Sequence, residues 1–289
     1  MSAVAPKYVG IDFSGDRTQW NPNAQASNVW IAVVEKQATG GSLTSLQRVQ
    51  QLPGQGRPFA RLAGWLAEGG FSAAAIDAPF SVPYWLFRQG LSDHDRLRAA
   101  INELPVNAAQ DFPTGNAFIT CVTASIQFQF TKPLRVTESY WRGRGVNTRS
   151  TVWAGARPGA PFASACVKLL ANASRPVWPW CGSEGIPLVE AFPAAQLRHW
   201  GLPYAQYNGL AGQAMENRRA IVADLTANRG LQVAKTFQAT LEADADALDA
   251  VLSSYAARAV LLNRLGVSLP PFEAWRQEGW IAVHDCDAW

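Results

Sequence analysis

The chain has 289 residues, of which 48% are hydrophobic and 16% charged, so it is long enough to bury a large core. Its formal net charge of +3 is too small to indicate nucleic-acid binding by itself, and its four cysteines lack the paired spacing of a structural zinc site. We find no basic flank before an apolar leader and no run of ~18 apolar residues, and therefore expect a soluble, cytoplasmic protein.

The N-terminal part of the chain is predicted to form mainly strands. Short apolar runs separated by polar turns predict strands over residues 7–13, 29–35 and 43–52. Because short loops connect these strands, we expect an antiparallel meander. An amphipathic stripe then predicts a helix over 57–68, and an apolar run predicts a strand over 73–78.

The remainder of the chain is predicted to mix helices with one or two strands. Residues 83–104 are expected to be helical, and 105–185 are rich in Gly, Pro, Trp and Arg with little periodicity. We interpret 105–185 as a long irregular insertion within a single domain of residues 1–289. Beyond it we expect a strand over 186–192, helices over 194–200, 213–229 and 244–265, and an edge strand over 281–284. This order favours a mixed α/β layer fold over strict βαβ alternation.

Three predicted strands each contain one acidic residue near their end, namely Asp12, Asp77 and Glu190. An ionised carboxylate in an apolar strand loses favourable hydration, so it requires an ion pair, hydrogen bonds, a metal ion or an exposed strand end. The alternation of a strand places Tyr8, Gly10 and Asp12 on one face.

The helix predicted over 244–265 carries further acids. Asp246 and Asp249 are three residues apart and share a face, and Asp249 adjoins the apolar stripe. If these acids meet the strand acids, their repulsion favours either proton uptake or a divalent cation. Mg²⁺ and Mn²⁺ prefer oxygen ligands and support phosphoryl transfer. The alternative is that each acid forms an ion pair or caps a turn, as helix N-terminal acids such as Asp244 and Asp246 often do.

Five short motifs occur in order along nearly the whole chain: YVGIDFS, AAIDAPFSVP, VEAFPAAQLRHWGLP with the YNG that follows it, DADALDAVLSSYAARA and EGWIAV. In these motifs the sequence resembles the domain-of-unknown-function 429 family, whose members are predicted nucleases with an RNase H-like fold. The resemblance implies an α/β fold in which three antiparallel strands and then parallel strands form a mixed sheet flanked by helices.

The resemblance also implies a set of site residues. Asp12 would lie on the first, central strand, Asp77 on the fourth and Glu190 on the fifth, with Asp246 and Asp249 facing them from a helix. All five would bind Mg²⁺ or Mn²⁺, and Asp12, Asp77, Glu190 and Asp249 would be catalytic.

Residues 132–157 combine six cations with a single acid, Glu138. The cations are Lys132, Arg135, Arg142, Arg144, Arg149 and Arg157, and the interleaved aromatic residues are Tyr140, Trp141 and Trp153. Because arginines contact phosphates and flat rings stack on bases, we predict that Arg142, Arg144 and Arg149, together with Ser14, contact a nucleic-acid substrate. The alternative is a solvated loop whose aromatic residues pack on the core.

Together these features predict a divalent-metal-dependent nuclease, with DNA and RNA both open as substrates. A second class is a catalytically inert protein that binds nucleic acid or another ligand on the same fold. An actin-like ATPase or sugar kinase also opens with an acid-bearing strand and a Gly-Ser turn, but it needs two similar halves with paired phosphate loops. The sequence shows neither these halves nor a GxxxxGK loop, and a serine hydrolase would need a GxSxG turn that is also missing.

Overall fold

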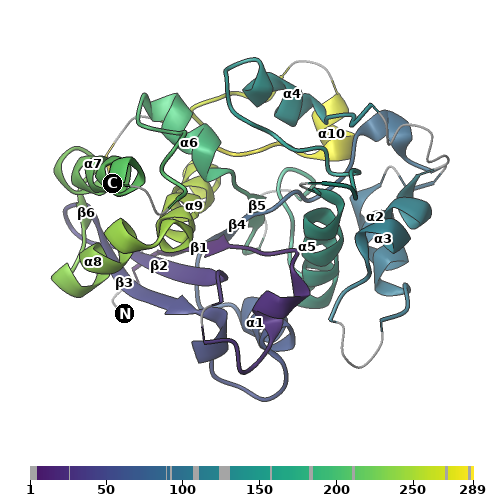
Figure 1. Ribbon diagram of the computed structural model, residues 1–289, viewed down its shortest axis with the longest axis horizontal. Helices are drawn as coiled ribbons and strands as arrows, with labels where there is room; N and C mark the ends of the chain where they lie inside the picture. The colour runs from purple at the N-terminus through teal and green to yellow at the C-terminus, as the bar shows by residue number, and fades with distance from the viewer. Residues whose placement is uncertain are drawn as a thin grey trace.

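A mixed sheet lies at the centre of the protein, with helices on both of its faces (Figure 1). The computed structural model describes residues 5–25, 27–88, 90–91, 93–106, 111–123, 131–156, 158–181, 185–209, 212–270, 273–285 and 288–289. Within these residues the strands are β1 (Lys7–Asp12), β2 (Trp30–Lys36), β3 (Gly41–Arg48), β4 (Ala73–Asp77), β5 (Leu188–Glu190) and β6 (Leu231–Gln232).

The strands are arranged in the order β5-β4-β1-β2-β3-β6. β1 pairs with β2, and β2 with β3, in antiparallel orientation, which confirms the predicted meander. On the other side of β1, β4 and β5 continue the sheet in parallel, and β6 runs parallel to β3 at the far edge. This mixed α/β arrangement confirms the predicted fold class and is consistent with the RNase H-like strand order.

The two faces of β1 pack against different helices, as the alternation of a strand requires. Val9 and Ile11 belong to the core under α1 (Pro58–Glu68) and α5 (Ala160–Ala173). Tyr8 faces the opposite core, beneath α9 (Ala245–Leu261), which lies across β1, β2 and β4. Figure 1 shows α9 and α1 on opposite sides of β1.

A glycine brings α9 unusually close to the central strand. A Cβ built on Gly10 would lie 1.9 Å from the Ala250 carbonyl oxygen and 2.4 Å from the Ser254 nitrogen. Only a residue without a side chain fits between the two backbones. Because Asp12 lies two residues further along the same face of β1, it points towards α9 as well.

The remaining helices surround this core. They are α2 (His94–Asn102), α3 (Gly115–Val122), α4 (Val136–Arg142), α6 (Pro193–Trp200), α7 (Gly212–Ala227), α8 (Lys235–Ala243) and α10 (Ala274–Glu278), with short 3₁₀ turns η1 (Arg17–Trp20), η2 (Val49–Gln51) and η3 (Tyr84–Leu86). No helix among the described residues is long and apolar enough to cross a membrane.

Two expectations from the sequence need correction. The continuous helix predicted over 83–104 is wrong: it contains η3 and then α2, separated by Gly90, whose φ of +86° is unfavourable in a helix. The edge strand predicted over 281–284 is also wrong: among the described residues this segment has an isolated bridge between His284 and Leu265 and one hydrogen bond from the Ala282 nitrogen to the Glu190 carbonyl oxygen at 3.0 Å, but no continuous strand pairing. The sheet edge next to β3 is instead occupied by β6.

The segment 105–185 contains α3, α4 and α5 between its irregular stretches. α5 lacks a clear apolar stripe because it is buried on two sides. Its Cys166 and Leu169 face the core beneath the sheet, whereas Ala163 and Val167 pack against α2 and α3. A helix buried on both sides has no polar face, so its sequence shows little periodicity.

Candidate metal centre

Three carboxylates meet where β1 and β4 end beneath α9. Asp12 is the last residue of β1, Asp77 is the last residue of β4, and the parallel register places the two side by side. Asp249 reaches them from α9, beyond its first turn. One carboxylate oxygen of each residue lies within 4.8 Å of those of the other two. The structure therefore brings together two of the three strand acids and one of the two helix acids that the sequence singled out.

Local structure at the start of α9 fixes the position of Asp249. Asp244 is the N-cap of this helix, and its Oδ1 accepts hydrogen bonds from the backbone nitrogens of Asp246 at 3.0 Å and Ala247 at 3.3 Å. Such a cap determines where the helix begins and which face each later residue occupies. For Asp244 the structure thus supports the capping alternative, whereas Asp249 lies on the face turned towards β1 and β4.

Burial makes these carboxylates costly to ionise. Asp12 is 7% exposed and Asp249 6% exposed. Burial, together with the charges of Asp246, Asp249 and Asp77, raises the pKa of Asp12 well above its usual range. Burial and the charge of Asp77 do the same to the pKa of Asp249, and burial and Glu190 raise the pKa of Asp77 to about 7. A divalent cation would relieve this repulsion.

The three acids differ in their hydrogen bonds. The Tyr207 hydroxyl donates to Asp249 Oδ1 at 2.8 Å. Across the described residues, the carboxylates of Asp12 and Asp77 have no hydrogen-bond or ion-pair partner. Tyr207 was not among the predicted site residues, although it opens the YNG motif of the family resemblance. Its role could have been suspected only from that motif.

Asp246 lies near the cluster without belonging to it. It is half-buried, and burial together with Asp244 raises its pKa to about 6. Its charge raises the pKa of both Asp12 and Asp77, so it contributes to the negative potential of the centre. The structure does not place its carboxylate in the group of three that could share one ion.

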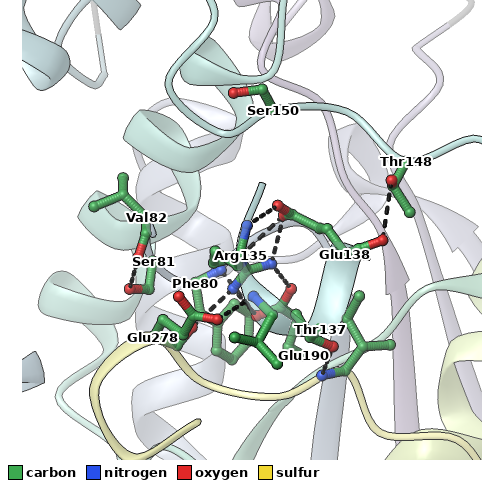
Figure 2. Close-up of polar contacts among 12 residues, drawn as sticks. Phe80, Ser81, Val82, Arg135, Thr137, Glu138, Thr148, Ser150, Glu190 and Glu278 are labelled. Atoms are coloured by element: carbon green, nitrogen blue, oxygen red, sulfur yellow. Dashed lines mark hydrogen bonds and ion pairs between the residues drawn. The ribbon is translucent and has the colours of Figure 1, made fainter. Parts of the chain in front are cut away.

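Glu190, which was predicted to be a metal ligand, is instead ion-paired in this structure. Its carboxylate is buried, forms a bidentate ion pair with Arg135, and accepts a hydrogen bond from the backbone nitrogen of Phe80 at 3.2 Å. Figure 2 shows Arg135 between Glu190 and Glu138. For Glu190 the structure thus supports the ion-pair alternative, because the guanidinium already compensates its charge.

A cavity of about 500 Å³ opens onto the three aspartates. Its lining includes Asp12, Asp77, Asp249, Asp246, Glu190, Arg149, Asn147 and Asn208. This volume is in the range of small-molecule sites, and polar groups at its wall can orient a bound ligand. The cavity therefore offers room for a cation and for a group that it would bind.

The predicted substrate residues do not all reach this cavity. Arg149 lines it, and its charge lowers the pKa of Asp77. Arg142 and Arg144 are exposed and lie outside the lining: Arg142 donates to the Thr148 carbonyl oxygen at 2.5 Å, and the Arg144 guanidinium stacks 3.4 Å from the centre of the Tyr140 ring. The structure therefore separates Arg149 from the other two.

Two of the cationic and aromatic residues of the basic segment 132–157 are buried in the folded protein. Arg135 and Trp141 are buried, so the segment is not a wholly solvated arm.

Ser14, the other predicted substrate residue, is also buried. Its Oγ accepts a hydrogen bond from the Asp16 nitrogen at 3.1 Å, and its carbonyl oxygen accepts one from Trp20 Nε1 at 2.9 Å. These contacts fix a turn rather than present Ser14 to a substrate. Arg157 lies outside the described residues.

Strand order and carboxylate cluster together define a mixed α/β protein with an RNase H-like sheet and a site that could hold a metal ion. The family model described as "Protein of unknown function (DUF429)" matches residues 182–273, which confirms the resemblance over that segment. The match contains Tyr207 and Asp249, whereas Asp12 and Asp77 precede it. No curated protein and no solved structure matches the chain.

Proposed function

We propose that the protein is a divalent-metal-dependent nuclease that hydrolyses phosphodiester bonds in nucleic acid. The observation that carries this proposal is the cluster of two buried aspartates, Asp12 and Asp249, and the half-buried Asp77, facing a cavity of about 500 Å³. The carboxylates of Asp12 and Asp77 form no hydrogen bond or ion pair in the described part of the chain. Buried carboxylates of this kind require a cation or protons, and an all-oxygen set suits Mg²⁺ or Mn²⁺.

The chain's own residues fit this chemistry. Asp12, Asp77 and Asp249 would hold the ion, and the Tyr207 hydroxyl would keep Asp249 oriented towards it. When bound, the ion supplies a water of lowered pKa and offsets negative charge on a phosphate group. Arg149, on the cavity wall, is placed to contact a phosphate oxygen of the same substrate.

The first test is the response of stability to metal in wild type and Asp12→Asn. Thermal melts are recorded for each protein in EDTA and in excess Mn²⁺. A ligand that binds only the native state stabilises it by about 2.7 kcal/mol at a hundredfold excess over Kd, so wild type should gain Tm with Mn²⁺. Asp12→Asn should gain none, and in EDTA it should be at least as stable as wild type, because the amide needs neither ionisation among like charges nor proton uptake on folding.

The matched control is Glu216→Gln, which makes the same carboxylate-to-amide change at an exposed position of α7. It should behave like wild type in both conditions. Nuclease assays with Mn²⁺ on single- and double-stranded DNA and RNA should show cleavage by wild type and by Glu216→Gln but not by Asp12→Asn. Equal stabilisation of Asp12→Asn and wild type by Mn²⁺ would contradict the metal site at Asp12.

A further inference from the structure

Arg135 forms a saturated network beside the aspartates (Figure 2). Its side chain is fully buried at the start of α4. Nε donates to Glu138 Oε1 at 3.0 Å, and Nη2 lies 2.9 Å from the same oxygen. Nη1 donates to Glu190 Oε2 at 2.8 Å and to the Glu278 carbonyl oxygen at 3.1 Å, while Nη2 also bonds Glu190 Oε1. Each N–H of the guanidinium therefore has a partner.

Glu190 is correspondingly unavailable to a metal ion. Both of its oxygens bond Arg135, and Oε2 also accepts from the Phe80 nitrogen. Releasing this carboxylate would leave a fully buried guanidinium without its bidentate partner, which is strongly unfavourable. In this respect Glu190 is the opposite of Asp12, which is equally buried but has no partner among the described residues.

The ion pair lies next to the aspartates and not elsewhere in the core. β5 pairs with β4 so that Glu190 lies opposite Ile76, the residue before Asp77. Arg135 and Glu190 both line the cavity onto which the aspartates open. The Arg135 guanidinium thus occupies the position beside Glu190 that a metal ion bound to Glu190 would need.

We propose that the centre binds a single divalent ion through Asp12, Asp77 and Asp249, and that the Arg135 guanidinium, paired with Glu190, replaces a second ion. This stoichiometry rests on the proposed function, since it presupposes that the aspartates bind metal. Two-ion sites hold their ions ~4 Å apart and need carboxylates for both. Here both oxygens of the carboxylate on β5 are already bonded to Arg135, so Arg135 is a positioning residue that keeps Glu190 from binding a second ion.

The test is the number of Mn²⁺ ions bound by the full chain, measured by isothermal titration calorimetry and by electron paramagnetic resonance. Wild type should bind one ion per chain and give the spectrum of an isolated, magnetically uncoupled Mn²⁺. Glu190→Gln should keep this stoichiometry, with Kd changed by less than about tenfold, the lower end of effects seen for outer-shell partners. Asp77→Asn, the matched control on the neighbouring strand, should weaken binding by more than about 100-fold.

Each contrary result has a distinct meaning. Two ions per chain, or a spin-coupled spectrum, would overturn the single-ion proposal while leaving the nuclease proposal intact. A loss in Glu190→Gln as large as that in Asp77→Asn would also overturn it, because Glu190 would then be a ligand. No Mn²⁺ binding by wild type would overturn both proposals. The wild-type stoichiometry needs no variant, so it decides the question even where Glu190→Gln fails to fold.

Discussion

Asp12 and Glu190 are both buried on the central sheet, yet among the residues that the structure describes Glu190 alone of the two forms an ion pair. The Arg135–Glu190 pair satisfies a charge internally and so holds α4 against β5. The carboxylate of Asp12, by contrast, lies close to Asp77 and Asp249 with repulsion in place of attraction. Removing the charge of Asp12 should therefore raise the free energy of unfolding in the absence of metal. Removing the charge of Glu190 should lower it, because the buried Arg135 loses its partner.

The hydrogen bond from Tyr207 to Asp249 leads to a prediction about metal affinity. Tyr207→Phe removes the hydroxyl that donates to Asp249 Oδ1 and keeps the aromatic ring. Loss of such an orienting partner should weaken Mn²⁺ binding by about 10- to 100-fold. Tyr204→Phe is the control, because Tyr204 lines the same cavity but does not bond Asp249. Calorimetric titration with Mn²⁺ measures both; equal affinities for the two variants would refute the orienting role.

Sequence patterns could identify buried acids but not their partners. Asp12, Asp77 and Asp249 are recognisable because each interrupts or adjoins an apolar pattern, and the structure brings them together. Glu190 has the same local pattern, and its difference arises from Arg135, which is 55 positions away in the chain. No local periodicity shows that contact, because it depends on how the segment before β5 folds back over the sheet.

At the scale of elements, the contact between β1 and α9 positions the centre. Gly10→Ala would place a Cβ 1.9 Å from the Ala250 carbonyl oxygen, so α9 must move away from β1. Overpacking against a backbone should lower the free energy of unfolding by about 3 kcal/mol or more and should weaken Mn²⁺ binding, because Asp249 moves with α9.

The control for this variant makes the same substitution where there is space. Gly64 lies within α1, and nothing lies within 4 Å of a Cβ built on it. Gly64→Ala should raise the free energy of unfolding by about 0.5 to 1 kcal/mol, since alanine favours a helix over glycine. Chemical denaturation of both variants measures the contrast. Equal changes in the two would contradict the close packing of α9 on β1.

Elements with a strong pattern could be predicted from the sequence, whereas short or fully buried ones could not. The first three strands and α9 have clear alternation or a long apolar run, and the structure confirms them. β6 has only two residues, too few to show a period, and it forms because β3 offers an unpaired edge. The sheet edge is a tertiary feature, so a segment such as 281–284 can look like a strand and donate one hydrogen bond to β5, from Ala282 to the Glu190 carbonyl oxygen, without pairing along it.

For the whole molecule, we propose that residues 1–289 form one domain with 105–185 as an insertion. α5 of that segment packs beneath the sheet beside α1, so the insertion shares the central core. The same segment supplies Arg135 to Glu190 and Arg149 to the cavity wall. The insertion would thus contribute both a buried cation and a substrate contact to the centre.

The placement of the surface arginines yields a prediction about nucleic-acid binding. Each phosphate contact that is lost should reduce the slope of log K against log salt by about 0.7 for a single strand or 0.9 for a duplex. Arg149→Ala should therefore weaken binding and flatten this slope, because Arg149 lines the cavity. Arg142→Ala, which changes another exposed arginine outside the lining, should leave the slope unchanged. Fluorescence anisotropy over a salt series measures both, and a flatter slope for Arg142→Ala alone would place the substrate elsewhere.

The contact of Gly10 with Ala250 and Ser254 also constrains the order in which the protein can fold during synthesis. The central strand β1 is synthesised before α9, the helix that covers one of its faces, which follows some 240 residues later in the sequence. Contacts of such high sequence separation slow folding and leave apolar surface uncovered in the meantime. Until residue 249 has left the ribosome, Asp12 and Asp77 lack their third partner. A nascent chain should therefore complete the proposed metal site only late in translation.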